Sequence, residues 1–304
     1  MTYERAGLAR VTAGLVAGAA MLPYLTLKVL WLAGRPIGVS DPGLMRESSM
    51  IGANAVTFGM EAVGLLLAVA LTMRWGLRLP AWLVLLPLWA GTGLLSEVAV
   101  TTPLALLTHG GAVFAGGSPV RPWVYLMVYG GFIVQGLALM TAFVLYARER
   151  WPFAFARFPF AGPAAPLHAV VARGVLLVAG VLGAVRLFWA VTGGGGGTSA
   201  AAGVQNGVKG VFAVGGALAL AALVRGQGPR RLVAAWLGSG ALFANGLYGS
   251  LLTVVGGPFG AAGAPVRIAD LFGLLTGARD GAVRGVPAGR TVRRARRAAG
   301  AAPA

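Results

Sequence analysis

Residues 11–33 read VTAGLVAGAAMLPYLTLKVLWLA, an apolar run that holds one charged side chain, Lys28. A helix needs about 20 predominantly apolar residues to cross the roughly 30 Å hydrocarbon core of a bilayer, so this run is long enough to span a membrane. Runs of similar length and composition recur along the chain, at about 50–73, 81–105, 123–147, 169–192, 203–224 and 232–256. The sequence therefore predicts a protein that crosses the membrane several times.

The overall composition favours helices in a membrane over a soluble domain. Hydrophobic residues make up 57% of the 304 positions and charged residues 11%, whereas soluble domains carry about 25% charged residues. Lipid offers no hydrogen-bond partner to open backbone groups, so a spanning segment is a helix or a strand of a closed barrel. The runs are too long for barrel strands and lack their alternation. We expect an all-α transmembrane bundle of seven or eight helices.

The arginines between the runs predict that the N-terminus is cytoplasmic, because cytoplasmic connections carry an excess of Lys and Arg. With the N-terminus inside, the inner connections hold 11 arginines and the outer ones four. The inner set is Arg5, Arg10, Arg74, Arg78, Arg148, Arg150, Arg157, Arg173, Arg225, Arg230 and Arg231, and the outer set is Arg35, Arg46, Arg121 and Arg267. The wide use of Arg, Ala, Gly and Pro is typical of GC-rich bacteria. We expect a multi-pass protein of a bacterial cytoplasmic membrane.

The C-terminal region predicts an eighth element and a basic tail. Seven crossings would leave the arginine-rich tail outside, against the same charge rule. Residues 258–277 are the candidate for an eighth crossing, although they contain Arg267 and Asp270 and have only a short apolar core. We expect a half-helix or a degenerate eighth helix that returns the tail to the cytoplasm. In the cytoplasm the tail would bind anionic lipid, with a contribution of about 1 kcal/mol per Arg. The alternative is a disordered tail that binds no lipid. The candidate lipid-binding residues are Arg293, Arg294, Arg296 and Arg297.

Three short motifs predict that the chain is a duplication. Three motifs in the first three runs have similar counterparts, in the same order, in the fifth, sixth and seventh runs. The pairs are KVLW at 28–31 and RLFW at 186–189, GMEAVG at 59–64 and GVFAVG at 210–215, and WAGTG at 89–93 and WLGSG at 236–240. Four runs separate the copies, so both copies begin on the same side of the membrane. The repeat is therefore parallel, with a pseudo-two-fold axis along the membrane normal. We expect two four-helix repeats, or a repeat of four helices followed by one of three.

This duplication divides the chain into four parts. The first transmembrane repeat covers residues 1–147, and the second covers residues 168–277. Between them, residues 148–167 form a basic, aromatic cytoplasmic linker of the kind that anchors at a membrane interface. Residues 278–304 form a basic disordered tail.

Charged side chains inside the runs are the candidate functional residues. A rise of 1.5 Å per residue places Glu61 near the bilayer centre and Lys28 in its outer third. Ionisable residues at such depths are costly and commonly mark ligand, ion or proton pathways. The predicted pocket opens toward the outer face of the membrane. Its expected residues are Lys28, Asn54, Glu61, Glu97, Arg186, Lys209 and Asn245.

Two interpretations of these charges stay open. Lys28, Glu97 and Arg186 lie close enough to the surface for their charged ends to reach water. Glu61 has no such route, so it must be protonated, ion-paired or hydrated, with Lys28 or Lys209 as the expected partner. Structural pairing between helices and a site for a ligand, an ion or a proton are both consistent with this pattern.

The residue types argue against several chemistries. The chain has no cysteine, which removes disulfides and thiolate metal sites. The two histidines, His109 and His168, fall near opposite membrane faces and are too far apart to share a metal or a haem. A hydroxyl nucleophile needs a base beside it, and no histidine lies at the depth of the intramembrane serines. We expect no cofactor, no metal and no nucleic-acid partner.

The stretch PYLTLKVLWLAG at 23–34 resembles a motif in the first helix of uncharacterised multi-pass membrane proteins of actinobacteria. The resemblance covers this run and its echo at 186–189, and it implies an architecture without a known activity. The function that we expect is binding or translocation of a small solute or proton in the charged pocket. A non-catalytic membrane scaffold or accessory subunit is the first alternative, and a lipid-modifying membrane enzyme is the second.

Overall fold

The computed structural model describes residues 2–114, 120–152, 165–195, 200–224, 229–255 and 263–278. Within these ranges the chain is an all-α bundle of eight helices, with three 3-10 segments in the connections and one isolated antiparallel bridge between Val39 and Val120. The helices are α1 (Thr2–Leu32), α2 (Ser48–Thr72), α3 (Ala81–His109), α4 (Pro122–Arg150), α5 (Ala165–Thr192), α6 (Ala200–Val224), α7 (Pro229–Val255) and a shorter helix at 264–278. The predicted all-α bundle is confirmed.

The distribution of polar side chains is that of a membrane protein. Helices α1 to α6 are long and apolar enough to cross a membrane. Large apolar side chains point outward from them, with Leu107 84% exposed and Val191 89% exposed. Several charged side chains within the helices are instead enclosed, and Glu97 is only 4% exposed. An apolar exterior of this kind is stable in contact with lipid, so the protein is embedded in a membrane.

The last two helices differ from the other six. Helix α7 has 27 residues, but it is not among the six helices that are long and apolar enough to cross a membrane. It packs against α3 and α6. The helix at 264–278 is about 22 Å long at 1.5 Å per residue, short of the roughly 30 Å hydrocarbon core. The predicted short eighth element is therefore present.

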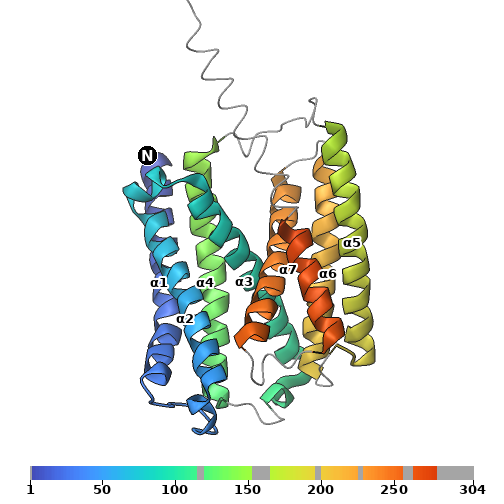
Figure 1. Cartoon of the computed structure of the whole chain (residues 1–304). Coiled ribbons are helices and arrows are strands. Elements are labelled where there is room, and N and C mark those ends of the chain that lie inside the picture. Colours follow the sequence, from blue (N-terminus) through green and yellow to red (C-terminus); the bar gives the residue numbers. More distant parts are fainter. Residues whose placement is uncertain are drawn as a thin grey trace, which may run out of the picture.

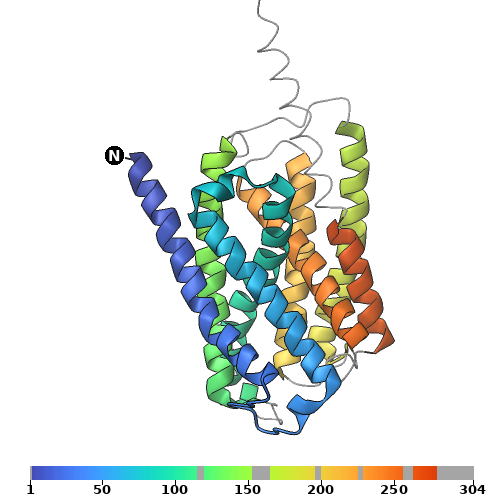
Figure 2. The same ribbon diagram turned by 60° about the vertical axis from the view of Figure 1, so that its left-hand side comes forward.

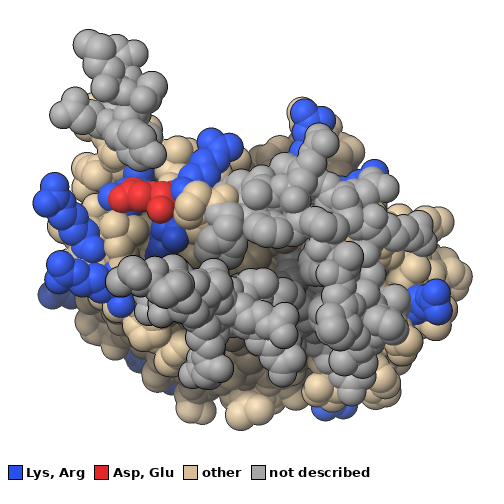
Figure 3. Space-filling view, turned by 90° about the horizontal axis from the view of Figure 1, so that it is seen from above, with Lys and Arg blue, Asp and Glu red and all other residues tan. Residues whose placement is uncertain are grey.

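The helices gather in two groups with α3 between them (Figures 1 and 2). The first group contains α1, α2 and α4, and the second contains α5, α6, α7 and the helix at 264–278. Helix α3 crosses from one group to the other, since it contacts α4 as well as α6 and α7. Helices α1, α3, α5 and α7 all begin at one face of the bundle. Figure 3 views that face, where Lys and Arg side chains lie around the rim.

Helices α3 and α7 touch at a pair of glycines. A Cβ atom on Gly93 of α3 would lie 2.2 Å from the carbonyl carbon of Gly240 in α7, and a Cβ on Gly240 would lie 2.4 Å from the Trp89 carbonyl oxygen. Real Cβ atoms do not approach other atoms so closely, so both positions require glycine for this contact. The absence of both side chains lets the two backbones meet, as small residues do in other membrane bundles.

Two hydrogen bonds flank this glycine contact. The indole Nε1 of Trp89 donates to the Ser239 hydroxyl at 3.1 Å, and the indole Nε1 of Trp236 donates to the Thr92 hydroxyl at 3.0 Å. The two bonds are reciprocal, because Trp89 and Thr92 hold the places in WAGTG that Trp236 and Ser239 hold in WLGSG. The junction between the two groups is thus nearly symmetric.

Candidate functional site

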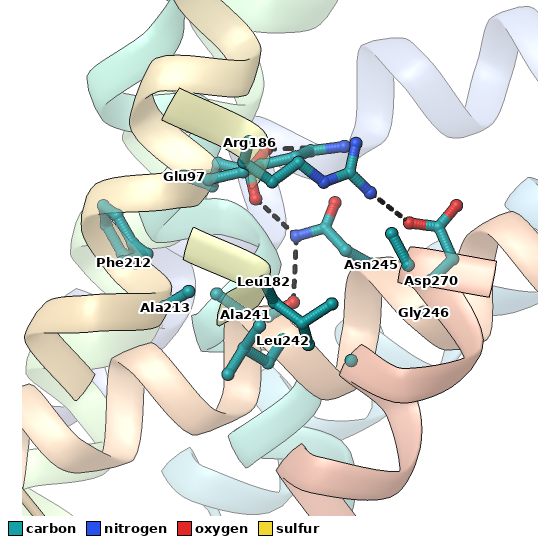
Figure 4. Close-up of a pocket in the computed structure, with 13 residues that line it drawn as sticks. Glu97, Leu182, Arg186, Phe212, Ala213, Ala241, Leu242, Asn245, Gly246 and Asp270 are labelled. Carbon is teal, nitrogen blue, oxygen red and sulfur yellow. Dashed lines mark hydrogen bonds and ion pairs between the residues drawn. The ribbon is translucent and has the colours of Figure 1, made fainter. Parts of the chain in front are cut away.

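A cavity of about 30 Å³ lies between α3, α5, α6, α7 and the helix at 264–278 (Figure 4). Apolar residues such as Leu182 and Phe212 form part of its wall. The polar side chains that line it are Glu97, Arg186, Lys209, Asn245 and Asp270. The first four of these belong to the predicted pocket, so residues from α3, α5, α6 and α7 come together as expected.

Glu97 is the most enclosed charge of this cluster. It lies on α3, which brings it against α7, and it is 4% exposed. The Asn245 side-chain amide donates to Glu97 Oε2 and also to the Ala241 carbonyl oxygen at 2.9 Å. The Lys209 ammonium lies 3.9 Å from Glu97 Oε1. Glu97 therefore has one direct hydrogen bond and one looser ionic neighbour.

Arg186 is held by three neighbours. Its Nη2 lies 2.5 Å from Asp270 Oδ1, and its Nη1 donates to Asn206 Oδ1 at 3.1 Å. The guanidinium carbon lies 5.3 Å from the centre of the Trp189 ring, within the range of a cation–π contact. Figure 4 shows Asn245 between Glu97 and Asp270, so the two carboxylates are parts of one cluster.

Two glycines on α7 make room for Asp270. A Cβ on Gly246 would lie 2.3 Å from the Asp270 carbonyl oxygen, and a Cβ on Gly249 would lie 2.5 Å from Asp270 Oδ2. Any larger residue at either position would push the helix at 264–278 away from α7. The spacing of these glycines, three apart on one helical face, brings the carboxylate of Asp270 to the cavity.

The cluster balances its own charge. Arg186 and Lys209 supply two positive charges, and Glu97 and Asp270 supply two negative ones. A water molecule needs about 10–15 Å³ of such volume, so a cavity of about 30 Å³ holds roughly two waters. Pockets for drug-sized ligands are about 300–1,000 Å³. In this conformation the site suits water, a proton or a single small ion.

Lys28 and Asn54, which the sequence assigned to the same pocket, lie in the first group of helices. The Lys28 ammonium donates to Asn54 Oδ1 at 2.7 Å and lies 4.9 Å and 5.0 Å from the ring centres of Tyr24 and Trp31. The Asn54 amide reaches the Met45 sulfur at 3.5 Å. The structure thus places these two residues in a separate cluster between α1 and α2.

Glu61 has a different partner from the one expected. Lys28 is hydrogen-bonded to Asn54 and Lys209 is paired with Glu97. Glu61 instead accepts a hydrogen bond from the side-chain amide of Gln135 at 3.2 Å. Depth along a helix is readable from the sequence, but the rotation of each helix decides which side chains of equal depth meet.

Asp270 is the cavity residue that sequence reasoning did not assign to the site. It sits in a segment too short to span the bilayer, where a charge is unremarkable. The signal that would have found it is the pair of glycines on α7, Gly246 and Gly249, because they indicate close approach by another element.

The remaining predicted site is the basic C-terminal tail. The tail arginines Arg293, Arg294, Arg296 and Arg297 lie outside the described residues. Within the described ranges, no group of three or more His, Asp or Glu side chains is arranged to hold a metal ion. The charged cavity is thus the candidate site.

No protein-family model, curated protein or solved structure matches the chain. The resemblance of residues 23–34 to actinobacterial membrane proteins stays a prediction. The function must accordingly be argued from the geometry of the cavity and its charges.

Proposed function

We propose that the protein binds and moves a proton, or a small solute coupled to a proton, through the charged cavity of its second group of helices. The observation that carries this proposal is the cluster of four ionisable side chains around a small cavity inside a membrane bundle. Ionisable side chains are costly to keep at such places and commonly belong to proton relays or ion pathways.

The size of the cavity favours a proton over a larger solute. Room for roughly two waters is too little for a sugar or an amino acid, whereas a proton needs only a chain of hydrogen-bonding groups. A larger solute would require the helix at 264–278 to move away from α7.

Glu97 and Lys209 are the pair proposed to exchange the proton. The 3.9 Å between Lys209 Nζ and Glu97 Oε1 is longer than a direct hydrogen bond of about 2.7–3.2 Å, and a water molecule suits such a gap. A proton leaves Nζ for the water while another passes from the water to Oε1. The result is a neutral amine and a neutral acid, and the reverse transfer restores the ion pair.

Arg186 and Asp270 have a different role in this scheme. The guanidinium of arginine does not lose its proton in proteins, so Arg186 stays positive throughout. Its close pairing with Asp270 at 2.5 Å supplies a fixed pair of charges beside the exchanging one. Asn245 holds Glu97 in place through its amide.

Proton flux into liposomes tests this proposal. The purified full chain is reconstituted with a pH-sensitive dye inside the vesicles, and a membrane potential is imposed to drive protons inward. Wild-type protein is compared with Glu97→Gln, which has nearly the same shape but does not exchange a proton. Glu47→Gln is the matched control, because Glu47 is exposed just before α2, outside the cavity.

We expect Glu97→Gln to lower the flux at least tenfold and Glu47→Gln to leave it unchanged. Equal flux through wild type and Glu97→Gln would refute the role of the cavity. Wild-type liposomes no more permeable than protein-free ones, with and without added small solutes, would refute transport altogether.

A scaffold or accessory subunit is the second candidate function. The observation that favours it is that each basic side chain of the cluster is paired with a carboxylate of another helix. Such ion pairs can serve only to hold the helices together. This candidate predicts no flux from the wild-type protein and a stoichiometric partner that co-purifies from the native membrane.

A further inference from the structure

Glu61 and Gln135 form a second polar pair, apart from the charged cavity. Glu61 lies on α2 and Gln135 on α4, and they are 7% and 3% exposed. The Gln135 side-chain nitrogen Nε2 donates to Glu61 Oε2 at 3.2 Å. The other oxygen of each side chain, Oε1 of Glu61 and Oε1 of Gln135, is buried without a hydrogen-bond partner. Two unpaired acceptors thus belong to the same two side chains that already share a bond.

The missing component of this pair is a proton donor. An ionised carboxylate and an amide oxygen both only accept hydrogen bonds, whereas a protonated carboxyl supplies one O–H donor. A carboxylic acid and a primary amide can form two bonds to each other. The amide N–H donates to one acid oxygen, and the acid O–H donates to the amide oxygen. One proton on Glu61 Oε1 would therefore satisfy both unpaired oxygens.

The surroundings of Glu61 supply no positive charge to balance a carboxylate. Within the described part of the chain, no ion pair joins Glu61 to a basic side chain. The phenol of Tyr24 on α1 interacts electrostatically with Glu61, and it also interacts with the phenols of Tyr129 on α4 and Tyr248 on α7. A buried charge without a partner is normally neutralised by taking or losing a proton.

We propose that Glu61 and Gln135 are a proton-binding site in the first group of helices, with one proton held on Glu61 and shared with the Gln135 amide oxygen. The inference does not rest on the proposed function, because the pair is outside the charged cavity and involves other helices. It assigns to the protein two places for a proton, a neutral acid in the first group and an ion pair in the second.

Infrared spectroscopy tests this site directly, because a protonated carboxyl has a C=O stretching band separate from those of carboxylates and amides. The full chain in liposomes at neutral pH is compared with Glu61→Gln, and Glu97→Gln is the matched control. We expect the band of a neutral acid in wild type, its complete loss in Glu61→Gln and its retention in Glu97→Gln. Exchange into D₂O should shift the band to lower wavenumber.

A second variant makes the role of Gln135 visible. In Gln135→Leu the acid loses its hydrogen-bond acceptor, so the neutral-acid band should stay and move to higher wavenumber. Glu61→Gln should keep the melting temperature of wild type, because a glutamine there can form the same two bonds with Gln135.

Two results would overturn the proposal. The first is a spectrum of wild type that lacks any neutral-acid band removable by Glu61→Gln. The second is a carboxylate band of Glu61 that shifts on addition of Na⁺, which would mean that the two free oxygens hold a cation. Failure of the flux proposal would leave these results unaffected, since loss of flux in Glu97→Gln and loss of the acid band in Glu61→Gln are separate measurements.

Discussion

At the residue scale, the ion pair of Arg186 and Asp270 explains how the helix at 264–278, whose outer face carries exposed apolar residues such as Phe272, is held against the bundle. Asp270 lies 2.5 Å from the guanidinium of Arg186, and both side chains are largely enclosed. Taking two charges out of water is expensive, and their mutual attraction offsets the cost only while both partners remain. The pair therefore ties the last helix to α5.

The first prediction concerns this pair. Asp270→Asn should lower the free energy of unfolding by about 3 kcal/mol, because removing one partner leaves a buried charge uncompensated. Thermal unfolding of purified protein in detergent measures it. Asp41→Asn is the control, since Asp41 is in an exposed loop where its Oδ1 accepts only from the Gly43 amide. A melting temperature of Asp270→Asn equal to that of the control would contradict the assignment.

The sequence showed which residues within the apolar runs are charged, but it indicated neither the place of Asp270 in the cavity nor the partner of Glu61. Glu97 and Lys209 carry visible charges within apolar runs, and they meet in one cavity. Glu61 meets Gln135 instead of a lysine. Helix rotation is set by packing on several neighbours at once, and a single sequence does not specify it.

At the element scale, the α3–α7 junction joins the two groups of helices. The contact depends on Gly93 and Gly240, and reciprocal tryptophan hydrogen bonds flank it. A further likeness lies in α1 and α5, where Lys28 and Arg186 each bond an asparagine of the next helix and each lie over a tryptophan ring. These paired contacts support the predicted duplication.

The second prediction tests the junction itself. Gly93→Ala should destabilise the protein by about 1–3 kcal/mol, as overpacking typically does, because the new Cβ would lie 2.2 Å from the backbone of Gly240. Gly91→Ala on the same helix is the matched control, since nothing lies within 4 Å of a Cβ there.

Thermal unfolding of both variants under one set of conditions gives the comparison. We expect a lower melting temperature for Gly93→Ala and a value at or slightly above wild type for Gly91→Ala, because alanine favours helix over glycine. Equal melting temperatures would mean that α3 and α7 do not meet at the glycine pair.

The elements themselves were predictable where apolar length decides them. All seven predicted runs correspond to helices, and every limit lies within four residues of the predicted one except the start of α1, which is nine residues earlier. Long apolar segments in lipid have no other regular structure available. The place of α7 and of residues 264–278 was less visible. Their packing against neighbouring helices rests on glycine contacts and on the pairing of Asp270, which hydropathy does not register.

At the scale of the whole molecule, polar chemistry is concentrated in two separate places. The first group of helices encloses the Glu61–Gln135 pair and the Lys28–Asn54 pair, and the second encloses the charged cavity. The sequence had predicted a single pocket. Two groups of helices with their own enclosed polar residues are what a duplicated chain would produce, with α3 connecting them (Figure 1).

The proposed proton pathway requires that water reaches the charged cavity. The chain has no cysteine, so an introduced cysteine is a unique probe. Ala241 lines the cavity and is 2% exposed, whereas Ala142 is 0% exposed in the apolar core of the first group. Both are equally hidden in a static structure, which makes Ala142→Cys a matched control.

The most direct measurement uses water itself as the probe: the rate at which the thiol of Ala241→Cys exchanges its proton for deuterium in D₂O, followed by the S–H stretching band of the protein in liposomes. We expect rapid exchange in Ala241→Cys and slow exchange in Ala142→Cys, because water fits the cavity of about 30 Å³ and is excluded from the apolar core. Exchange in Ala241→Cys as slow as in Ala142→Cys would contradict access of water to the cavity.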